Sequence, residues 1–135
     1  MIAIMLNNIS NLDSVIKMIR QDPRILAAYV LGSAANGTMR PASDLDIAIL
    51  LKSGTKISSV ELFELAADLT TVAKRNVDLG QLSSQNLIYA SEALLKGHRF
   101  CCQDTSKADL LAATLLGLAM EFQIERKEII DAYTV

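Results

Sequence analysis

Residues 25–51 read ILAAYVLGSAANGTMRPASDLDIAILL, and the predicted architecture is built around them. They contain two uninterrupted apolar runs, Ile25–Leu31 and Leu45–Leu51, of the length and composition that are typical of buried strands. Between the runs, residues 33–43 are rich in Gly, Ala, Asn, Ser and Pro, which predicts a turn with room for a short helix. The sequence therefore predicts two neighbouring strands joined by a polar connection.

Helical periodicity is found on both sides of these strands. Apolar residues at helical spacing predict a first helix over residues 10–21, in which Ser10 and Asp13 resemble an N-terminal capping arrangement. A long helix is predicted over residues 57–74, with an apolar face formed by Leu62, Leu65, Leu69 and Val72. The remaining elements are expected to be a strand (76–82), a helix from Ser83 or Ser84 to Lys96, a short edge strand (98–103) and a final helix (106–132).

The order of these elements is helix, strand, strand, helix, strand, helix, short strand, helix. This order predicts an α/β fold of the α+β type, in which a mixed β-sheet is packed with helices. A length of 135 residues and a hydrophobic share of 51% suit a single domain over residues 1–135. No apolar stretch approaches the ~20 residues that a membrane-spanning helix needs, so we expect no membrane contact.

The charge balance and the cysteine content indicate which ligands and which cellular compartment to expect. The 13 Lys and Arg residues against 15 Asp and Glu give a formal charge of −2. This balance argues against direct nucleic-acid binding, which needs a basic face, but it allows a nucleotide whose charge a metal ion offsets. The two cysteines, Cys101 and Cys102, are adjacent and unsuited to a disulfide, as expected of a cytoplasmic protein.

Acidic residues occupy strand positions where apolar residues would be expected. Asp44 and Asp46 are two residues apart, so on a strand they project to the same face. Two adjacent carboxylates repel each other unless a cation lies between them, and Mg²⁺ prefers such oxygen ligands. Asp78 lies between two apolar residues of a later predicted strand, where a charged side chain is uncommon unless it has a partner or a function. It is the natural third acid of a metal site, and the alternative is an ion pair with Lys74 or Arg75.

Gly32 and Ser33, which end the first apolar run, predict phosphate binding. Glycine allows the backbone to turn tightly and approach a ligand, and serine supplies a hydroxyl and a backbone N–H at a possible helix start. Nucleotidyl transfer requires a phosphate-binding turn joined by one loop to metal-binding carboxylates, because the metal ions bridge the triphosphate and activate the attacking hydroxyl. The arrangement therefore predicts nucleotidyl-transfer chemistry.

Together these residues resemble the minimal nucleotidyltransferases of the polymerase-β-like superfamily. The resemblance rests on Gly32-Ser33, a ten-residue spacer, Asp44-x-Asp46 and the later Asp78. It implies that Asp44 and Asp46 bind two Mg²⁺ ions, and that Asp78 completes the site and acts on the incoming hydroxyl. It also implies that Gly32 and Ser33 hold the triphosphate of ATP.

One departure from the family pattern concerns the residues after Gly-Ser. Related sequences often carry basic residues there, whereas this chain has Ala34, Ala35 and Asn36. Arg40 is the only positive charge in the loop, so we expect it to substitute as the phosphate contact. The alternative is that Arg40 is an ordinary solvated loop residue and that phosphate is bound more weakly.

The chain has little beyond this core, so it resembles the stand-alone type that forms the antitoxin half of bacterial HEPN/MNT toxin–antitoxin pairs. That resemblance implies transfer of AMP from ATP to a tyrosine of a HEPN ribonuclease toxin, which is thereby silenced, and a hetero-oligomer with the toxin. Two alternatives stay open. One is a nucleotidyltransferase that acts on a small hydroxyl compound of the aminoglycoside type, and the other is an antitoxin that neutralises by binding alone.

The final predicted helix bears on the question of a partner. Residues 108–120 are apolar almost all round, which is typical of a helix buried on two sides. Its second apolar side is covered either by the domain itself, in a wholly internal helix, or by a partner, which would be a second copy or the toxin. We expect Leu111, Leu115, Leu118 and Phe122 to face the domain's own core, and Leu110, Leu116 and Met120 to face away from it.

Overall fold

A computed structural model describes residues 11–134 of the chain. Its four strands form one mixed sheet in the order β3-β2-β1-β4. β1 pairs antiparallel with β2 and with β4, and β2 pairs parallel with β3. The elements are α2 (Leu12–Arg20), β1 (Ile25–Leu31), α3 (Gly32–Asn36), β2 (Leu45–Leu51), α4 (Ser59–Ala73), β3 (Val77–Gln81), α5 (Leu87–Lys96), β4 (His98–Cys102) and α6 (Thr105–Tyr133).

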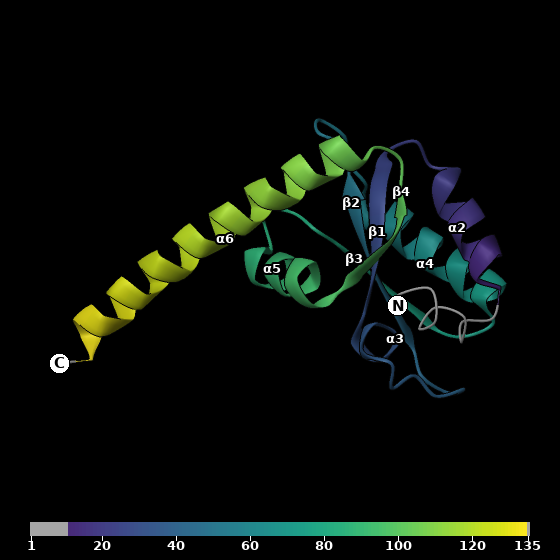
Figure 1. Ribbon diagram of the computed structural model, residues 1–135, viewed down its shortest axis with the longest axis horizontal. Helices are drawn as coiled ribbons and strands as arrows, with labels where there is room; N and C mark the ends of the chain where they lie inside the picture. The colour runs from purple at the N-terminus through teal and green to yellow at the C-terminus, as the bar shows by residue number, and fades with distance from the viewer. Residues whose placement is uncertain (1–10, 135) are drawn as a thin grey trace.

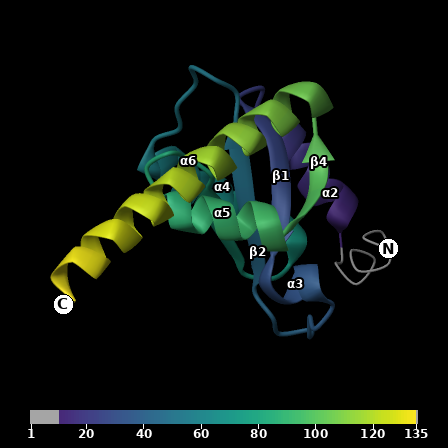
Figure 2. The ribbon, with the colours of Figure 1, turned by 60° about the vertical axis from the view of Figure 1, so that its left-hand side comes forward.

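Helices cover both faces of the sheet, α2 and α4 on one side and α5 and α6 on the other (Figures 1 and 2). Alternate residues of β2 belong to different cores because successive side chains of a strand point to opposite faces. Leu45 and Ile47 pack in the α2/α4 core, whereas Ala48 and Leu50 pack in the α5/α6 core. This arrangement confirms the predicted mixed sheet packed with helices.

The two apolar runs form β1 and β2 with the predicted bounds. All residues of β1 except Leu31 are buried, as are all residues of β2 except Asp46. β1 and β2 are the two central strands of the sheet, which explains why their sequences are apolar without alternation. β4 lies at the edge, as its short sequence led us to expect.

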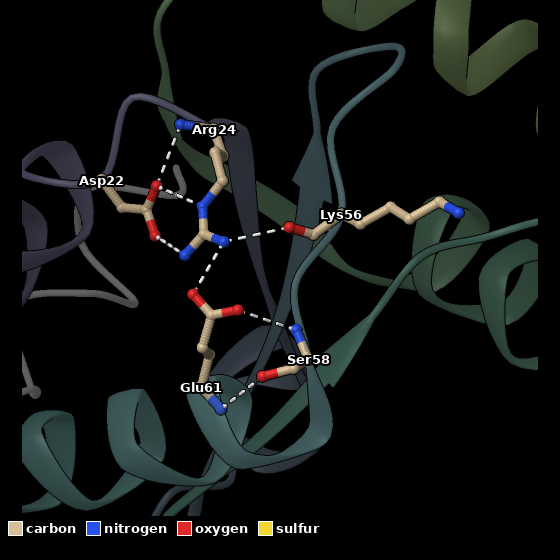
Figure 3. Close-up of polar contacts among 5 residues, drawn as sticks. All are labelled: Asp22, Arg24, Lys56, Ser58 and Glu61. Atoms are coloured by element: carbon tan, nitrogen blue, oxygen red, sulfur yellow. Dashed lines mark hydrogen bonds and ion pairs between the residues drawn. The ribbon is translucent and has the colours of Figure 1, made fainter.

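An arginine joins the α2/α4 layer to the sheet (Figure 3). α4 begins at a capping box in which the Glu61 N–H donates to Ser58 Oγ and the Ser58 N–H donates to the Glu61 carboxylate. The Arg24 guanidinium lies between Asp22 and Glu61, at 2.9 Å and 2.8 Å, and also donates to the Lys56 carbonyl at 3.0 Å. Arg24, Asp22 and Glu61 therefore each have an opposite charge beside them.

Two helix starts differ from the prediction. Ser10 lies outside the described residues, and α2 is preceded by Asn11 in a left-handed conformation with φ 60°. α5 starts after Asn86 rather than after Ser83 or Ser84. The reason is a hydrogen-bonded turn, in which the Ser83 N–H donates to Asn86 Oδ1 at 3.1 Å and the helix begins only beyond it.

The final helix has its predicted range within a residue or so, but its burial is not as predicted. α6 buries a narrow stripe of Ala108, Leu115 and Ala119, whereas Leu118 and Phe122 are 39% and 41% exposed. Beyond Ala119 every described residue is exposed, because the helix runs past the sheet (Figure 1). The wholly internal helix is therefore wrong, as is the inward orientation of Leu118 and Phe122. Of the residues expected to face away, Leu110 and Met120 are exposed and Leu116 is half-buried.

The two cysteines lie on β4 and form no disulfide. Cys101 and Cys102 are both free thiols. Their neighbouring positions on β4 direct Cys101 into the α2/α4 core and Cys102 toward the α5/α6 core. Within the described range, no helix has both the length and the apolar character needed to cross a membrane.

Candidate active site

Asp46 and Asp78 lie side by side on neighbouring parallel strands, where they are register partners. The residues before them, Leu45 and Val77, are paired in the same way and are buried in the α2/α4 core. Because side chains alternate along a strand, both carboxylates project to the opposite face, which α5 covers. There they line a cleft with a volume of about 430 Å³. The structure thus brings these two acids together.

Among residues 11–134, no basic side chain forms an ion pair with these carboxylates. In the described part of the chain, the ion pairs involve neither Asp44, Asp46 nor Asp78. Burial, and then the negative charges of Asp78 and Asp44, raise the pKa of Asp46. The ion pair of Asp78 with Lys74 or Arg75, considered as an alternative, is not formed. The cleft therefore carries negative charge that the protein does not neutralise.

Asp44 occupies a different position from the other two acids. It is exposed, lies just before β2 and does not line the cleft, although its charge contributes to the raised pKa of Asp46. Among residues 11–134, no three acidic, histidine or cysteine side chains are arranged to hold a metal ion. Two of the three predicted acids therefore converge, and the third is exposed beside them.

The chemistry of the cleft nevertheless fits a hard divalent cation. Its charged donors are carboxylate oxygens alone, and the pKa of Asp46 is raised by burial and then by the neighbouring negative charges, whose repulsion a cation would relieve. Mg²⁺ typically takes one or two protein carboxylates and completes its shell with phosphate oxygens and water. A pair of converging carboxylates is thus a suitable protein contribution to such a site.

Gly32 brings the start of α3 into contact with Asp46. Its φ of +59° lies in the left-handed region, and a Cβ at this position would lie 2.5 Å from Asp46 Oδ2. Only glycine meets both constraints without strain. The half-buried Ser33 follows directly, and Ala34 and Ala35 are buried. Burial explains why the first two positions after Gly-Ser are small and apolar here rather than basic, whereas Asn36, the third, is exposed.

The loop between α3 and β2 is held by an arginine that the sequence analysis did not single out for this role. The Arg75 guanidinium donates to the carbonyls of Arg40 and Ser43, at 3.4 Å and 3.3 Å. The Arg40 N–H also donates to Ser43 Oγ at 2.8 Å, so the segment leading to Asp44 is tied down. Arg40 itself is exposed and does not line the cleft.

Besides Leu31 at the end of β1, three residues that line the cleft were not predicted from the sequence. Gly80 lies two positions after Asp78, on the same face of β3, while Asn86 and Tyr89 come from the start of α5. The Asn86 side chain donates to the Gln81 carbonyl at 2.9 Å and so fixes the loop that leads into α5. A glycine inside a strand pattern was an available signal for close approach by another group.

Comparisons with known proteins agree with this geometry. The sequence matches the family described as "Polymerase beta, Nucleotidyltransferase" over residues 13–106. It is 29% identical over 123 residues to a protein of Shewanella oneidensis named protein adenylyltransferase MntA, covering 90% of this chain and 86% of that protein.

Two solved structures share the fold of this chain. One is a toxin–antitoxin crystal structure with AMP-PNP, with a TM-score of 0.76 and 27% identity, covering 91% of this chain and 98% of that one. The other is a tri-AMPylated HEPN toxin of Shewanella oneidensis in complex with an MNT antitoxin, with a TM-score of 0.72 and 24% identity over 93% and 97% of the two chains. With the family match across most of its length, the chain belongs to the polymerase β nucleotidyltransferase family.

Proposed function

We propose that this chain is an antitoxin that acts as a protein adenylyltransferase, transferring AMP from ATP to a tyrosine of a cognate HEPN ribonuclease toxin. The observation that carries the proposal is the pair of facing carboxylates, Asp46 and Asp78, in a cleft without a neutralising base. The name of the Shewanella relative and the AMP-PNP bound in the similar toxin–antitoxin structure support the same activity.

The proposed site residues divide into a metal-binding and a phosphate-binding group. Asp44, Asp46 and Asp78 would hold two Mg²⁺ ions, which offset the charge of the triphosphate and of the leaving pyrophosphate when bound. Gly32 and Ser33, at the start of α3, would bind the triphosphate through backbone N–H groups. We keep the exposed Arg40 as the proposed basic phosphate contact, since its guanidinium donates no hydrogen bond to another described residue.

Transfer requires the acceptor hydroxyl to approach the α-phosphorus from the side opposite the pyrophosphate. A bond forms between the tyrosine oxygen and the α-phosphorus as the bond from that phosphorus to the bridging oxygen breaks, and pyrophosphate leaves. Asp78 accepts the tyrosine proton and later releases it to solvent. Asp78 suits this role because it is exposed on β3, beside Asp46, and is held by no ion pair within residues 11–134.

The outer part of α6 is the surface that we assign to the toxin. Its large apolar side chains are exposed along both sides, which is unusual for a helix without a partner. An isolated helical segment of this length is only marginally stable in water, so contact with a partner would stabilise it. The exposed apolar residues of this part are Met120, Phe122, Ile124, Ile129, Ile130 and Tyr133.

Two further proposals accompany this function. We place the protein in the cytoplasm, in keeping with the free thiols of Cys101 and Cys102. We also propose that it does not bind nucleic acid directly, because its formal charge is −2 and the acids of its cleft would repel a phosphate backbone in the absence of a cation.

The test is an assay with labelled ATP, Mg²⁺ and the purified cognate HEPN toxin. We expect label on a toxin tyrosine, and we expect Asp44→Asn together with Asp46→Asn to abolish it. Glu64→Gln together with Asp68→Asn removes the same charge from exposed positions on α4 and should leave transfer unchanged. Equal neutralisation of the toxin by the Asp44/Asp46 variant would show that binding alone neutralises it.

A further inference from the structure

Tyr89 is the point at which three hollows of the surface meet. It lines the acidic cleft with Asp46 and Asp78, and a hollow of about 250 Å³ beside Gly32 and Lys96. It also lines a hollow of about 550 Å³ between the start of α5 and Phe122 of α6. No other described residue lines all three. Tyr89 therefore borders both the acidic cleft and the hollow beside Gly32.

The phenol of Tyr89 is held against the backbone of β3. A Cβ at Gly80 would overlap the Tyr89 hydroxyl and the ring carbons next to it. Gly80 follows Asp78 by two residues and faces the same way, so the hydroxyl lies on the same side of the sheet as the two carboxylates. The missing side chain of Gly80 thus makes the space that the phenol occupies.

The hydroxyl of Tyr89 is available as a hydrogen-bond donor. Burial, and then the negative charges of Asp78 and Asp46, raise the pKa of Tyr89, so the phenol stays protonated at neutral pH. The O–H donates to no other described residue, whereas the Asn86 amide in the same cleft is already bonded to the Gln81 carbonyl. Among the described residues that line the cleft, Tyr89 is the one whose side-chain donor group makes no hydrogen bond.

A donor in an acidic cleft matches a transferred phosphoryl group. The start of α3 contacts Asp46, so a triphosphate bound at Gly32 places a phosphate within the space that Tyr89 lines on both sides. Negative charge grows on the leaving group and is spread over the nonbridging oxygens during transfer, and a fixed donor there strengthens its bond as the reaction proceeds.

We propose that the Tyr89 hydroxyl donates a hydrogen bond to a nonbridging oxygen of the α-phosphate of the bound nucleotide and is a catalytic residue. The proton stays on Tyr89 throughout, so the proposed transfer keeps its balance of atoms and charge. The inference rests on the proposed function only in taking the phosphoryl group from a nucleoside triphosphate. It applies to any acceptor, water included.

The first test is Tyr89→Phe, which removes the hydroxyl and keeps the ring. We expect kcat to fall roughly 10- to 100-fold, as for loss of a hydrogen bond to a charged group, with KM for ATP changed by less than about threefold. Tyr29→Phe makes the same change at a buried position on β1 that does not line the cleft, and it should leave kcat unchanged. An unchanged kcat in Tyr89→Phe, or an effect on KM alone, would overturn the inference.

The second test asks whether Gly80 positions the phenol. Gly80→Ala should lower kcat by displacing the hydroxyl, and it should have little further effect in a Tyr89→Leu background, where the shorter side chain leaves room for the new methyl group. Losses that multiply in the double variant would show that the two residues act independently and would contradict the proposal. Circular dichroism checks that each variant is folded.

Both tests are run with the toxin and also with water as the acceptor, measuring the release of AMP from ATP. If the wild-type protein releases AMP but labels no toxin, the proposal that a toxin tyrosine is the acceptor is contradicted. The Tyr89 variants can still be compared by their release of AMP. If the wild-type protein labels the toxin and the Tyr89→Phe variant labels it equally fast, only the inference about Tyr89 is contradicted.

Discussion

Two groups of carboxylates in this small domain differ in the charges that surround them. Asp22 and Glu61 flank the Arg24 guanidinium on the α2/α4 side of the fold (Figure 3). The hydrogen bonds of Arg24 to Asp22, and of Ser58 and Arg24 to Glu61, lower the pKa values of both acids. Asp46 and Asp78 face each other on the α5 side without any such partner, and the pKa of Asp46 is raised.

The comparison separates acids that stabilise the fold from acids that are available to a ligand. Around Arg24 each charge is neutralised inside the protein, so nothing further needs to bind. In the cleft, like charges are held together by the register of β2 and β3, which works against stability. Clustered acids with a perturbed pKa in a cleft are the pattern of a functional site, and a bound cation would relieve their repulsion.

The largest expected effect comes from replacing aspartate by asparagine in the cleft, and the same replacement beside Arg24 serves as the comparison. Asp46→Asn should lower AMP transfer by on the order of 1000-fold or more, because it removes a proposed metal ligand, while the melting temperature stays equal or rises. Asp22→Asn should leave transfer unchanged and lower the melting temperature, because Arg24 loses a partner. Steady-state transfer rates and thermal denaturation, both measured on purified protein, test the pair.

Either of two results would break this contrast. A folded Asp46→Asn protein that retains transfer within about tenfold of the wild type would mean that the cleft acids are not the catalytic ones. Loss of transfer in Asp22→Asn as severe as in Asp46→Asn, at a temperature where both are folded, would mean that the Arg24 group also serves the reaction.

A smaller effect is expected from Gly32→Ala, which disturbs the cleft without changing its charge. The new Cβ would lie 2.5 Å from Asp46 Oδ2 and so displace this carboxylate from its position beside Asp78. We expect transfer to fall by roughly 10- to 100-fold, together with about 1 kcal/mol of backbone strain at positive φ. Transfer rates and the free energy of unfolding measure the two contributions.

Gly37 offers a matched control for the strain. It also has positive φ, +78°, but a Cβ there would meet nothing within 4 Å. Gly37→Ala should therefore show the loss of stability without the loss of transfer. Equal transfer rates in the two alanine variants would show that contact with Asp46 is not what requires glycine at position 32.

The third effect is the response to magnesium. We propose that Mg²⁺ binds the folded cleft and not the unfolded chain, so it should raise the melting temperature of the wild type by a few degrees at concentrations well above its dissociation constant. Asp22→Asn should respond in the same way, whereas Asp46→Asn should respond little. A shift of equal size in all three proteins would place the bound cation outside the cleft.

The central part of this comparison was predictable from the sequence. The uninterrupted apolar runs fixed β1 and β2 to the residue, and strand alternation placed Asp46 on the face opposite Leu45. The helix between β2 and β3 allowed a parallel pair, which is why Asp78 returns beside Asp46. These features depend on local patterns, which a sequence states directly.

Other parts depend on tertiary packing and were not predictable. Tyr89 reaches the cleft because α5 begins late, after the turn that Asn86 and Ser83 form, and because Gly80 leaves room for its ring. Likewise, the apolar composition of α6 does not say where the sheet ends. Phe122 is therefore exposed, although its spacing matched the buried stripe.

The smallest expected effect is on how stability changes with pH, and its sign differs between the two groups. Asp22 has a lowered pKa in the folded state, so its contribution to stability is complete above the ordinary pKa of aspartate, about 3.9, and is lost as the pH falls through the folded value. Asp46 has a raised pKa, so its repulsion is fully present above that raised value and disappears on acidification.

Melting curves in buffer without divalent cations should resolve this difference. At neutral pH, Asp46→Asn should melt about 2 °C above the wild type and Asp22→Asn about 2 °C below it. On acidification the gain in Asp46→Asn should shrink first, since Asp46 takes up its proton at a higher pH than Asp22. A gain that persists below pH 3, where the wild-type carboxyl is protonated and no longer repels its neighbours, would show that amide packing rather than relieved repulsion stabilises the variant.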